Sequence, residues 1–299
     1  MNKFNELKVE FNKNMVQLLT NIIDSEELLE RVLYCLEKGK RLRPVMAIDI
    51  CNELAGNREN ALKFATAIEL IHNSSLIIDD MPCMDNDDYR RGKLSFHKKY
   101  SVTQGQITAK YLVNLAFRLV NENFQNHDNE IMDIVFQNIC KNIGILGAAG
   151  GQLMDIVSTN CFGNKKELLN NSKKKDIIRD LFMKKTCSFF EIAFLGGYLT
   201  GNGNIENLEL VKKAAFNFGI AFQIYDDFDD IEQDLLRRNS NLNDPNYINN
   251  FGVEEAFKDF IAALDNFRTI MQSLSLYSSV MEKLHDFLLA KVNNKYKNL

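Results

Sequence analysis

Residues 61–88 read ALKFATAIELIHNSSLIIDDMPCMDNDD, and they join a long apolar helix pattern to a run of aspartates. Residues 61–78 are apolar on several faces, so we expect a central helix there. Pro82 is expected to end or kink that helix. The aspartates follow at once, at positions 79, 80, 85, 87 and 88. Because neighbouring carboxylates raise one another's pKa and resist burial, this cluster indicates a bound cation.

Asp79 and Asp85 are six residues apart, which on a straight helix would separate their side chains by about 120°. A break at Pro82 would let the chain curl so that both carboxylates meet the same ions. His72 and Ser75 precede Asp79 by seven and four residues, so they share its helix face. A satisfied core histidine is the alternative interpretation of His72.

A second cluster, Asp226-Asp227-Phe-Asp229-Asp230, lies in another predicted helix. Asp226 and Asp230 are four residues apart and therefore share one face, together with Gln223 and Gly219. The small Gly219 would leave room for a ligand. A solvated acidic face is the alternative, but aromatic and aliphatic residues surround these carboxylates. Two facing acidic clusters predict several Mg²⁺ ions, and such ions usually carry a phosphorylated substrate.

Basic residues accompany the first cluster. Arg90 and Arg91 follow it directly, and a shorter basic run occupies residues 38–43. Charge balance alone could explain the two arginines, and a solvated helix end could explain the earlier run. A diphosphate substrate explains both signs of charge at once, because metal ions bind some oxygens and guanidinium groups bind others.

The composition predicts an all-α protein. The chain has 299 residues, of which 45% are hydrophobic, with only 3 Pro, 15 Gly and no Trp. We expect one domain over residues 1–299, with about ten helices. The net charge of -4 gives no electrostatic reason to expect nucleic acid. The 6 cysteines show no metal-ligand spacing, and no stretch reaches the length of a transmembrane segment, so a cytoplasmic enzyme is expected.

Helical periodicity extends through most of the chain. Strand signals are weak. Loops are predicted over residues 86–104, 158–174 and 235–251. The predicted helices are 26–37, 61–78, 110–120, 131–146, 176–199, 208–231, 253–274 and 280–292.

Taken in order, these motifs resemble the trans-prenyl diphosphate synthases, the group of farnesyl and geranylgeranyl diphosphate synthases. The match spans about residues 39–234. It comprises Gly39-Lys40-Arg41-Leu42-Arg43-Pro44, His72-x-x-Ser75-Leu76-x-x-Asp79-Asp80-x-Pro82-x-Met84-Asp85-x-Asp87-x-x-Arg90-Arg91-Gly92, Gly150-Gly151-Gln152-x-x-Asp155, Lys185-Thr186 and Phe222-Gln223-x-x-Asp226-Asp227-x-x-Asp230. The resemblance implies a helical bundle of the isoprenoid synthase type around a central active-site cavity, and a homodimer.

The resemblance also implies a role for each matching residue. Three Mg²⁺ ions would be held by Asp79, Asp85 and Asp226, with Asp80 and Asp230 in support, and Asp227 and Lys185 complete the expected catalytic set. The allylic diphosphate would be bound by Arg90, Lys185, Thr186 and Gln223. Isopentenyl diphosphate would be bound by Lys40, Arg43, His72 and Arg91.

Product length is expected to depend on Ser74 and Ser75. In the resembled family, bulky aromatics at these two places stop growth at fifteen carbons, whereas serine is small. We therefore predict geranylgeranyl diphosphate as the product, with farnesyl diphosphate as the alternative. The usual lysines after the second cluster are replaced around Arg237-Arg238. A non-catalytic partner subunit, a class I terpene cyclase and a Mg²⁺ phosphohydrolase are the competing interpretations.

Overall fold

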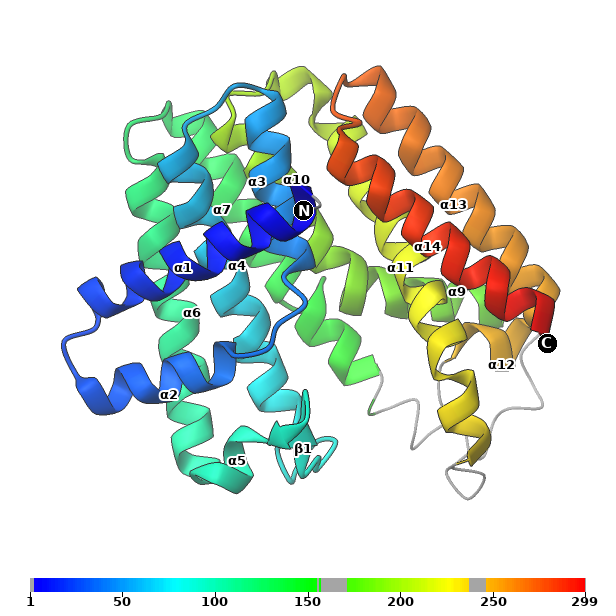
Figure 1. Cartoon of the computed structure of the whole chain (residues 1–299), viewed down its shortest axis with the longest axis horizontal. Coiled ribbons are helices and arrows are strands. Elements are labelled where there is room, and N and C mark those ends of the chain that lie inside the picture. The colour runs from blue at the N-terminus through cyan, green and yellow to red at the C-terminus, as the bar shows by residue number, and fades with distance from the viewer. Residues whose placement is uncertain (1–2, 155, 157–170, 237–245, 299) are drawn as a thin grey trace. The chain divides into compact units, whose positions relative to one another are not determined.

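A computed structural model of the chain describes residues 3–154, 156, 171–236 and 246–298, and in 171–175, 230–236 and 298 the backbone alone. Figure 1 shows that the described elements are helices apart from one small hairpin. The elements are α1 (Lys3–Ile22), α2 (Glu26–Leu36), α3 (Leu42–Glu53), α4 (Arg58–Asp79), β1 (Tyr89–Arg90), β2 (Lys93–Leu94), α5 (Phe96–Lys99), α6 (Val102–Phe124), α7 (Asn129–Ile143), α9 (Asn171–Phe182), the π-helix η1 (Met183–Cys187), α10 (Ser188–Thr200), the 3₁₀ helix η2 (Ile205–Asn207), α11 (Leu208–Leu236), α12 (Tyr247–Phe251), α13 (Val253–Ser273) and α14 (Ser279–Asn298). The predicted all-α class is confirmed.

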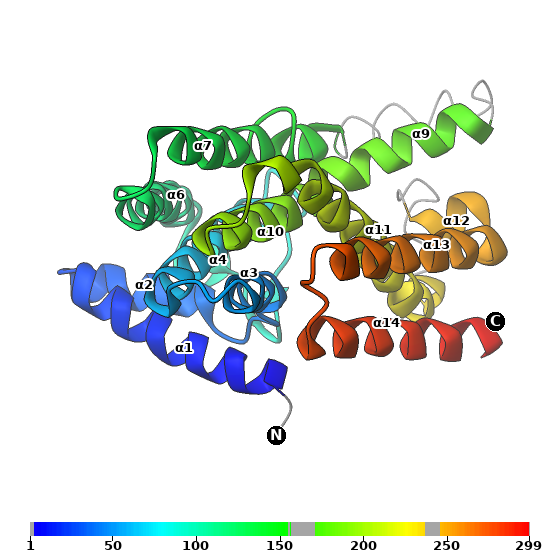
Figure 2. The same cartoon turned by 90° about the horizontal axis from the view of Figure 1, so that it is seen from above.

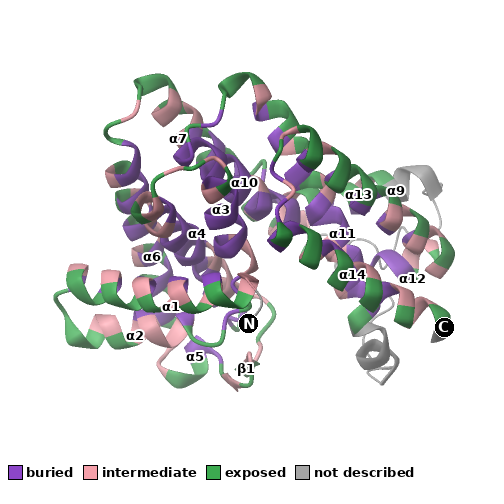
Figure 3. Cartoon of the chain, turned by 45° about the horizontal axis from the view of Figure 1, so that its top comes forward, coloured by how far each residue is buried: buried purple, intermediate pink, exposed green. Residues whose placement is uncertain are grey.

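The chain forms two compact units, and α10 contributes residues to both. The first unit comprises residues 1–135 and 196–203, and α4 is its central helix, packed against α3 and α6. Buried residues extend along most of α4 (Figure 3). Two adjacent glycines let α10 approach closely. A Cβ on Gly196 would lie 1.8 Å from Cζ of Phe64, and one on Gly197 would lie 2.5 Å from the Ala47 carbonyl oxygen. Any side chain at either glycine would therefore separate the helices.

The second unit comprises residues 136–195 and 204–299. Its helices α11, α13 and α14 pack against one another, as Figure 2 shows. A cluster of phenylalanines fills this core. The ring centroid of Phe218 lies 5.0 Å from that of Phe190 and 5.1 Å from that of Phe267, both in edge-to-face geometry. Aromatic pairs of this kind stabilise a core by about 0.5–1.5 kcal/mol beyond their buried area.

Most predicted helices are confirmed. Those over 26–37, 61–78, 208–231, 253–274 and 280–292 correspond to α2, α4, α11, α13 and α14, with shifted ends. The predicted helix over 110–120 is the middle of the longer α6. The predicted helix over 131–146 begins earlier, at Asn129, and ends earlier, at Ile143. The helix predicted over 176–199 is interrupted by η1, a geometry that apolar periodicity does not reveal.

The three predicted loops need correction. Residues 86–104 contain the hairpin β1–β2, the short helix α5 and the start of α6. The hairpin turn consists of Arg91 and Gly92, both with positive φ (54° and 73°), as a type I′ turn requires. Each strand has only two residues, too few for a detectable alternation. Residues 171–174 and 247–251 are helical, whereas 158–170 and 237–245 lie outside the described residues.

Among the described helices, none has both the length and the apolar character that a bilayer crossing requires. The expectation of a single domain over residues 1–299 stays a prediction, since the two units are described separately.

Candidate functional site

The first aspartate cluster begins where α4 ends. Asp79 is the last helical residue, and Asp80 caps the helix. Because Pro82 follows, the chain turns back, and the backbone N–H of Asp85 donates to the Asp79 carbonyl oxygen at 2.9 Å. The N–H of Asn86 donates to the Met81 carbonyl oxygen at 3.0 Å. The predicted curl is confirmed for the backbone, and joint metal binding by Asp79 and Asp85 stays a prediction.

Asp80 and Arg90 bind each other. Nε of Arg90 donates to Oδ1 of Asp80 at 2.7 Å, and Nη2 donates to the same oxygen and to Asp87 Oδ2 at 3.1 Å. Asp80 is buried, and this burial raises the pKa of its carboxyl group, although the Arg90 hydrogen bond opposes the rise. The pair fastens the hairpin to the end of α4. The expected roles of Asp80 in metal binding and of Arg90 in allylic diphosphate binding stay predictions.

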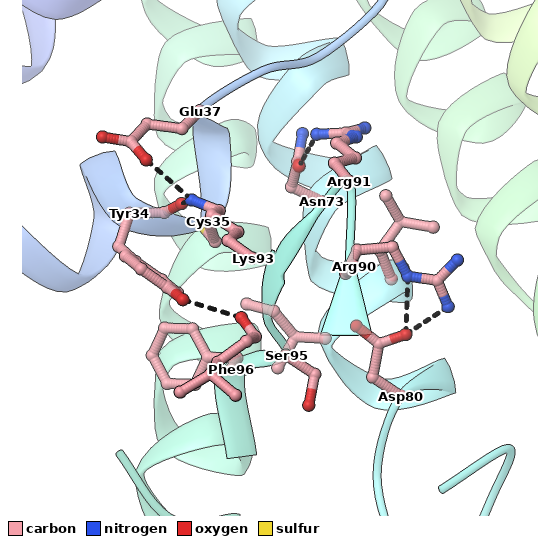
Figure 4. A pocket seen from close by; sticks show the side chains of 13 residues that line it. Tyr34, Cys35, Glu37, Asn73, Asp80, Arg90, Arg91, Lys93, Ser95 and Phe96 are labelled. Atoms are coloured by element: carbon pink, nitrogen blue, oxygen red, sulfur yellow. Dashed lines mark hydrogen bonds and ion pairs between the residues drawn. The ribbon is translucent and has the colours of Figure 1, made fainter. Parts of the chain in front are cut away.

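Arg91 has a different environment from its neighbour. Its Nη1 donates to the amide oxygen of Asn73 at 3.1 Å (Figure 4). Within the described part of the chain, no carboxylate oxygen lies within 4 Å of the Arg91 guanidinium. Burial lowers the pKa of Arg91, but an arginine remains charged at neutral pH. A half-buried cation that faces a neutral amide is a suitable partner for an anion.

A small cavity of about 30 Å³ lies between α2, α4, the hairpin and α5, where Figure 4 shows Arg90 and Arg91. This volume holds about two water molecules and no diphosphate. Lys93 lines it, with Nζ 3.0 Å from Glu37 Oε2 and 3.7 Å from the centre of the Tyr34 ring. Arg90 and Arg91 themselves line this cavity, and Lys93 supports the hairpin.

The predicted ligands of isopentenyl diphosphate share one electrostatic environment. Burial, and then the nearby guanidinium groups of Arg43 and Arg91, lower the pKa of His72 well below its usual range. His72 is therefore neutral at pH 7. Arg43 is half-buried, and Lys40 is exposed. The charges of Arg43 and Arg91 thus act on the His72 ring. The binding of isopentenyl diphosphate by these three residues stays a prediction.

Arg41 of the same basic run has a structural role. Its side chain is buried, and Nη1 lies 2.5 Å from Oε1 of buried Glu69. Nε donates to Asn12 Oδ1 at 2.8 Å, and Nη2 donates to the Leu36 carbonyl oxygen. Arg41 has a φ of 62°, and a Cβ on Gly39 would lie 2.3 Å from its Nη1. Sequence reasoning singled out neither Glu69 nor Asn73, because both lie within an apolar helix pattern without a motif of their own.

The two predicted chain-length residues differ in their contacts. Ser74 is buried, and its hydroxyl donates to the Ala109 carbonyl oxygen of α6 at 3.0 Å. Ser75 is half-buried, and its hydroxyl donates to the His72 carbonyl oxygen of its own helix at 2.9 Å. Ser74 therefore lies at the interface between α4 and α6, and a larger side chain there would press on α6.

The second cluster lies on α11, and a hydrogen-bonded chain runs beside it. Thr186 Oγ1 donates to Gln223 Oε1 at 2.6 Å, and Gln223 Nε2 donates to Asp227 Oδ1 at 3.0 Å. The other Asp227 oxygen accepts the backbone N–H of Tyr247 at 2.7 Å. Asp227 thus anchors the start of α12, while Asp226 is half-buried and the Asp230 side chain lies outside the described residues.

Two glycines allow other segments to pack closely near these hydrogen-bonded side chains. A Cβ on Gly219 would lie 2.6 Å from Sγ of Cys187, so the prediction that Gly219 leaves space for a ligand is wrong. A Cβ on Gly151 would lie 2.8 Å from the backbone nitrogen of Lys185. Close packing therefore holds the π-helix η1, which presents Lys185 and Thr186. Single-turn π-helices are frequent at functional sites. Asp155 lies outside the described residues.

The candidate metal ligands are carboxylates. Among the residues that the structure describes, no three side chains of His, Cys, Asp or Glu lie close enough together to hold an ion by themselves. Asp79 and Asp85 of the first unit and Asp226 of the second offer oxygen only. Mg²⁺ is usually bound by one or two carboxylates, with water and phosphate oxygens as its other ligands, so the donors of each cluster, taken by itself, fit Mg²⁺.

The all-α fold, with one aspartate cluster at the end of α4 and another on α11, defines a protein of the isoprenoid synthase type. The polyprenyl synthetase family model matches residues 25–244, and the chain belongs to this family.

Named relatives agree with this assignment. The chain is 35% identical over 197 residues to a chloroplastic geranylgeranyl pyrophosphate synthase of Capsicum annuum, an alignment that covers 66% of this chain and 51% of the relative. It is 31% identical over 238 residues to a geranylgeranyl diphosphate synthase of Cyanophora paradoxa, covering 77% and 76%. The chain spans about half the length of the plant relatives it matches.

A solved structure supports the fold. The apo crystal structure of an FPP/GFPP synthase from Zymomonas mobilis matches with a TM-score of 0.75 at 26% identity. The match covers 92% of this chain and 98% of that one.

Proposed function

We propose that the chain is a short-chain trans-prenyl diphosphate synthase, which condenses isopentenyl diphosphate head-to-tail with an allylic diphosphate and depends on Mg²⁺. The observation that carries this proposal is the charge pattern around α4. Arg91 is a half-buried cation without a carboxylate within 4 Å among the described residues, and it lies close enough to His72 and Arg43 to influence the His72 pKa. A cluster of this sign attracts anions, and a diphosphate fits it.

In this proposal, Asp79, Asp85 and Asp226 would hold Mg²⁺, which when bound would supply positive charge to stabilise a departing diphosphate. Three ions per site are expected. Arg91, Arg43, His72 and Lys40 bind isopentenyl diphosphate. Neutral His72 offers a hydrogen bond rather than a charge, so the arginines supply the positive potential.

The hydrogen-bonded side chains of Thr186, Gln223 and Asp227 mark a second set of substrate-binding groups in the proposal. Gln223 is held at both ends of its amide, by Thr186 and by Asp227. Lys185, next to Thr186 in η1, supplies the cation. We propose that Lys185, Thr186, Gln223 and Arg90 bind the allylic diphosphate. Arg90 remains fully charged, but Asp80 and Asp87 already compensate part of its charge.

We propose geranylgeranyl diphosphate as the product, with farnesyl diphosphate second. Small Ser74 and Ser75 support a long product. The printed names of the Capsicum annuum and Cyanophora paradoxa relatives, both geranylgeranyl diphosphate synthases, support the same choice.

One assay tests the activity. The purified protein is incubated with Mg²⁺, radiolabelled isopentenyl diphosphate and each allylic primer in turn, and the products are dephosphorylated and resolved by length. Linear alcohols of twenty carbons are expected. Cyclic hydrocarbons would instead identify a terpene cyclase, release of phosphate without elongation would identify a phosphohydrolase, and elongation only after addition of another synthase would identify a partner subunit.

Two variants of the first cluster sharpen this assay. Asp79→Ala should lower kcat by several orders of magnitude without unfolding the protein, because it removes a proposed Mg²⁺ ligand. Asp88→Ala is the matched control, since Asp88 belongs to the same cluster but pairs with Lys98 at 2.7 Å on the surface. Equal activity of the two variants would refute the metal-binding role of Asp79.

A homodimer and a cytoplasmic location are also proposed. Size-exclusion chromatography with light scattering tests the first, and a mass of one chain, 34.4 kDa, would contradict it. Fractionation of the source cells tests the second, and recovery in an organelle fraction would contradict it.

A further inference from the structure

Asn73 of α4 occupies an unusual place for an amide, inside an otherwise apolar helix. It is 1% exposed. Its Nδ2 donates to the Glu69 carbonyl oxygen at 2.8 Å and to Glu69 Oε1 at 2.9 Å. Both acceptors lack hydrogens, so the orientation of the amide is fixed. Its oxygen must therefore face the other way, toward Arg91.

Glu69 is itself held in place. Its Oε1 also accepts from Nη1 of Arg41, so one carboxylate oxygen supports both a buried guanidinium and the Asn73 amide. The charge of Glu69 is thereby matched by Arg41. Burial lowers the pKa of Arg91, and the negative charge of Glu69 partly opposes this, but the direct contact of Arg91 is a hydrogen bond to the neutral amide of Asn73. The network therefore orients Arg91 without a direct ion pair to Glu69.

Arg91 needs such an orienting contact. It lies in a two-residue turn with a φ of 54°, a conformation that is unfavourable for a residue with a Cβ. Its long side chain loses rotamer freedom when it binds a ligand. Its hydrogen bond to Asn73 uses one of five N–H donors, and Figure 4 shows the guanidinium of Arg91 directed at Asn73, away from the Arg90–Asp80 pair.

We propose that Asn73 is a positioning residue, which with Glu69 holds Arg91 in the orientation that binds the diphosphate of isopentenyl diphosphate. This inference rests on the proposed function, in which Arg91 binds that diphosphate. A carboxylate at position 73 would neutralise Arg91, and an apolar residue would release it. An amide orients the guanidinium and preserves its charge.

Steady-state kinetics test the proposal. Asn73→Ala should raise the KM for isopentenyl diphosphate about tenfold, the effect of losing one hydrogen bond to a charged group. The KM for the allylic substrate and kcat should stay within about twofold, since the side chain of Asn73 binds Glu69 and Arg91, and neither is a proposed ligand of the metal or of the allylic diphosphate. An equal rise in both KM values would overturn the proposal.

A double-mutant cycle separates positioning from general destabilisation. In an Arg91→Ala background, Asn73→Ala should change the KM for isopentenyl diphosphate no further, because its effect passes through Arg91. Additive effects of the two substitutions would overturn the proposal.

Asn142 supplies a matched control from another helix. It is also buried, and its Nδ2 donates to a carbonyl oxygen one turn earlier, of Asn138 at 2.9 Å, and to Glu191 Oε1 at 3.0 Å. In the described part of the chain, no arginine donates to it. Asn142→Ala should lower the melting temperature about as much as Asn73→Ala and leave the KM for isopentenyl diphosphate unchanged. A similar KM rise in both variants would contradict a specific role of Asn73.

Two further results, a variant that does not fold and an inactive parent protein, also decide between the hypotheses. If Asn73→Ala does not fold, Asn73→Ser retains a hydroxyl for the Glu69 carbonyl but is too short to reach Arg91, so it should show the same tenfold rise. Failure of both variants to fold would make Asn73 a folding residue and overturn the proposal. A parent protein that elongates nothing would refute the proposed function, whereas an active parent with an unchanged Asn73→Ala would refute this inference alone.

Discussion

The buried ion pair between Arg41 and Glu69 allows a quantitative prediction for Glu69→Gln. The side chains are 4% and 2% exposed, and the N–O distance is 2.5 Å. Glutamine preserves the volume, so no cavity confuses the result. The substitution leaves Arg41 buried with neutral acceptors alone, which are Asn12, the Leu36 carbonyl group and the new amide oxygen at position 69. Removing one partner of a buried pair costs about 3–5 kcal/mol of unfolding free energy.

This loss of unfolding free energy should appear as a lower melting temperature. For a chain of 299 residues, the unfolding entropy is about 0.6 kcal/mol/K, so the melting temperature should fall by about 5–8 °C in a calorimetric scan. Glu122→Gln is the control, because Glu122 pairs with Arg118 on the surface, where the two side chains are 34% and 57% exposed. Such a pair is worth about 0.3–0.5 kcal/mol, which is below 1 °C here.

A third variant identifies the cause. Replacing both partners, as Arg41→Met with Glu69→Leu, leaves no buried charge and should recover most of the lost stability. A Glu69→Gln protein that melts within 1 °C of the Glu122→Gln protein would refute the argument that Arg41 depends on this carboxylate.

Three further predictions follow from single side chains. Ser74→Phe should shorten the product by one isoprene unit, because the ring crowds the interface of α4 and α6; an unchanged product length contradicts this. Burial lowers the pKa of His72, so its contribution to stability is complete above about pH 6.5 and is lost as the pH falls. Up to about 1.4 kcal/mol should therefore disappear one pH unit lower, and His72→Gln should remove that dependence in urea titrations. Iodoacetamide near pH 8 should label exposed Cys83 well before Cys35 and Cys51, whose pKa values burial raises to about 12 and about 11; peptide mass spectrometry reports the order.

The helices could be predicted because their signals are local. Apolar periodicity located α2, α4, α11, α13 and α14, and the end of α4 followed from Pro82. The interruption at η1 could not be predicted in the same way. It depends on the approach of a second segment, where Gly151 packs on the backbone of Lys185. Gly219 was misread for a similar reason, since nothing in the sequence shows that Cys187 occupies the space beside it.

The basic run at residues 38–43 also contains a difference that the sequence alone does not reveal. Composition alone makes Lys40, Arg41 and Arg43 equivalent cations. The structure separates them, because the left-handed backbone of Arg41 and the bare Gly39 allow that one guanidinium to reach Glu69. Glu69 lies far along the chain in α4, so only the folded arrangement distinguishes this structural arginine from the other cations of the run.

The adjacent arginines of the hairpin make the strongest argument for where an anion binds. Arg90 is the last residue of β1 and Arg91 the first of the turn, and their side chains meet different surroundings. Arg90 meets two carboxylates, which compensate its charge. Arg91 meets the neutral amide of Asn73, which orients it, and the more distant Glu69 carboxylate compensates its charge only in part. Because a half-buried charge with partial compensation is costly, folding stabilises this arrangement only if the network through Asn73 and Glu69 offsets the cost or an anion does. The removal of Asn73 therefore affects both the free protein and the affinity for a diphosphate, and the two effects have separate measurements, in melting temperature and in KM.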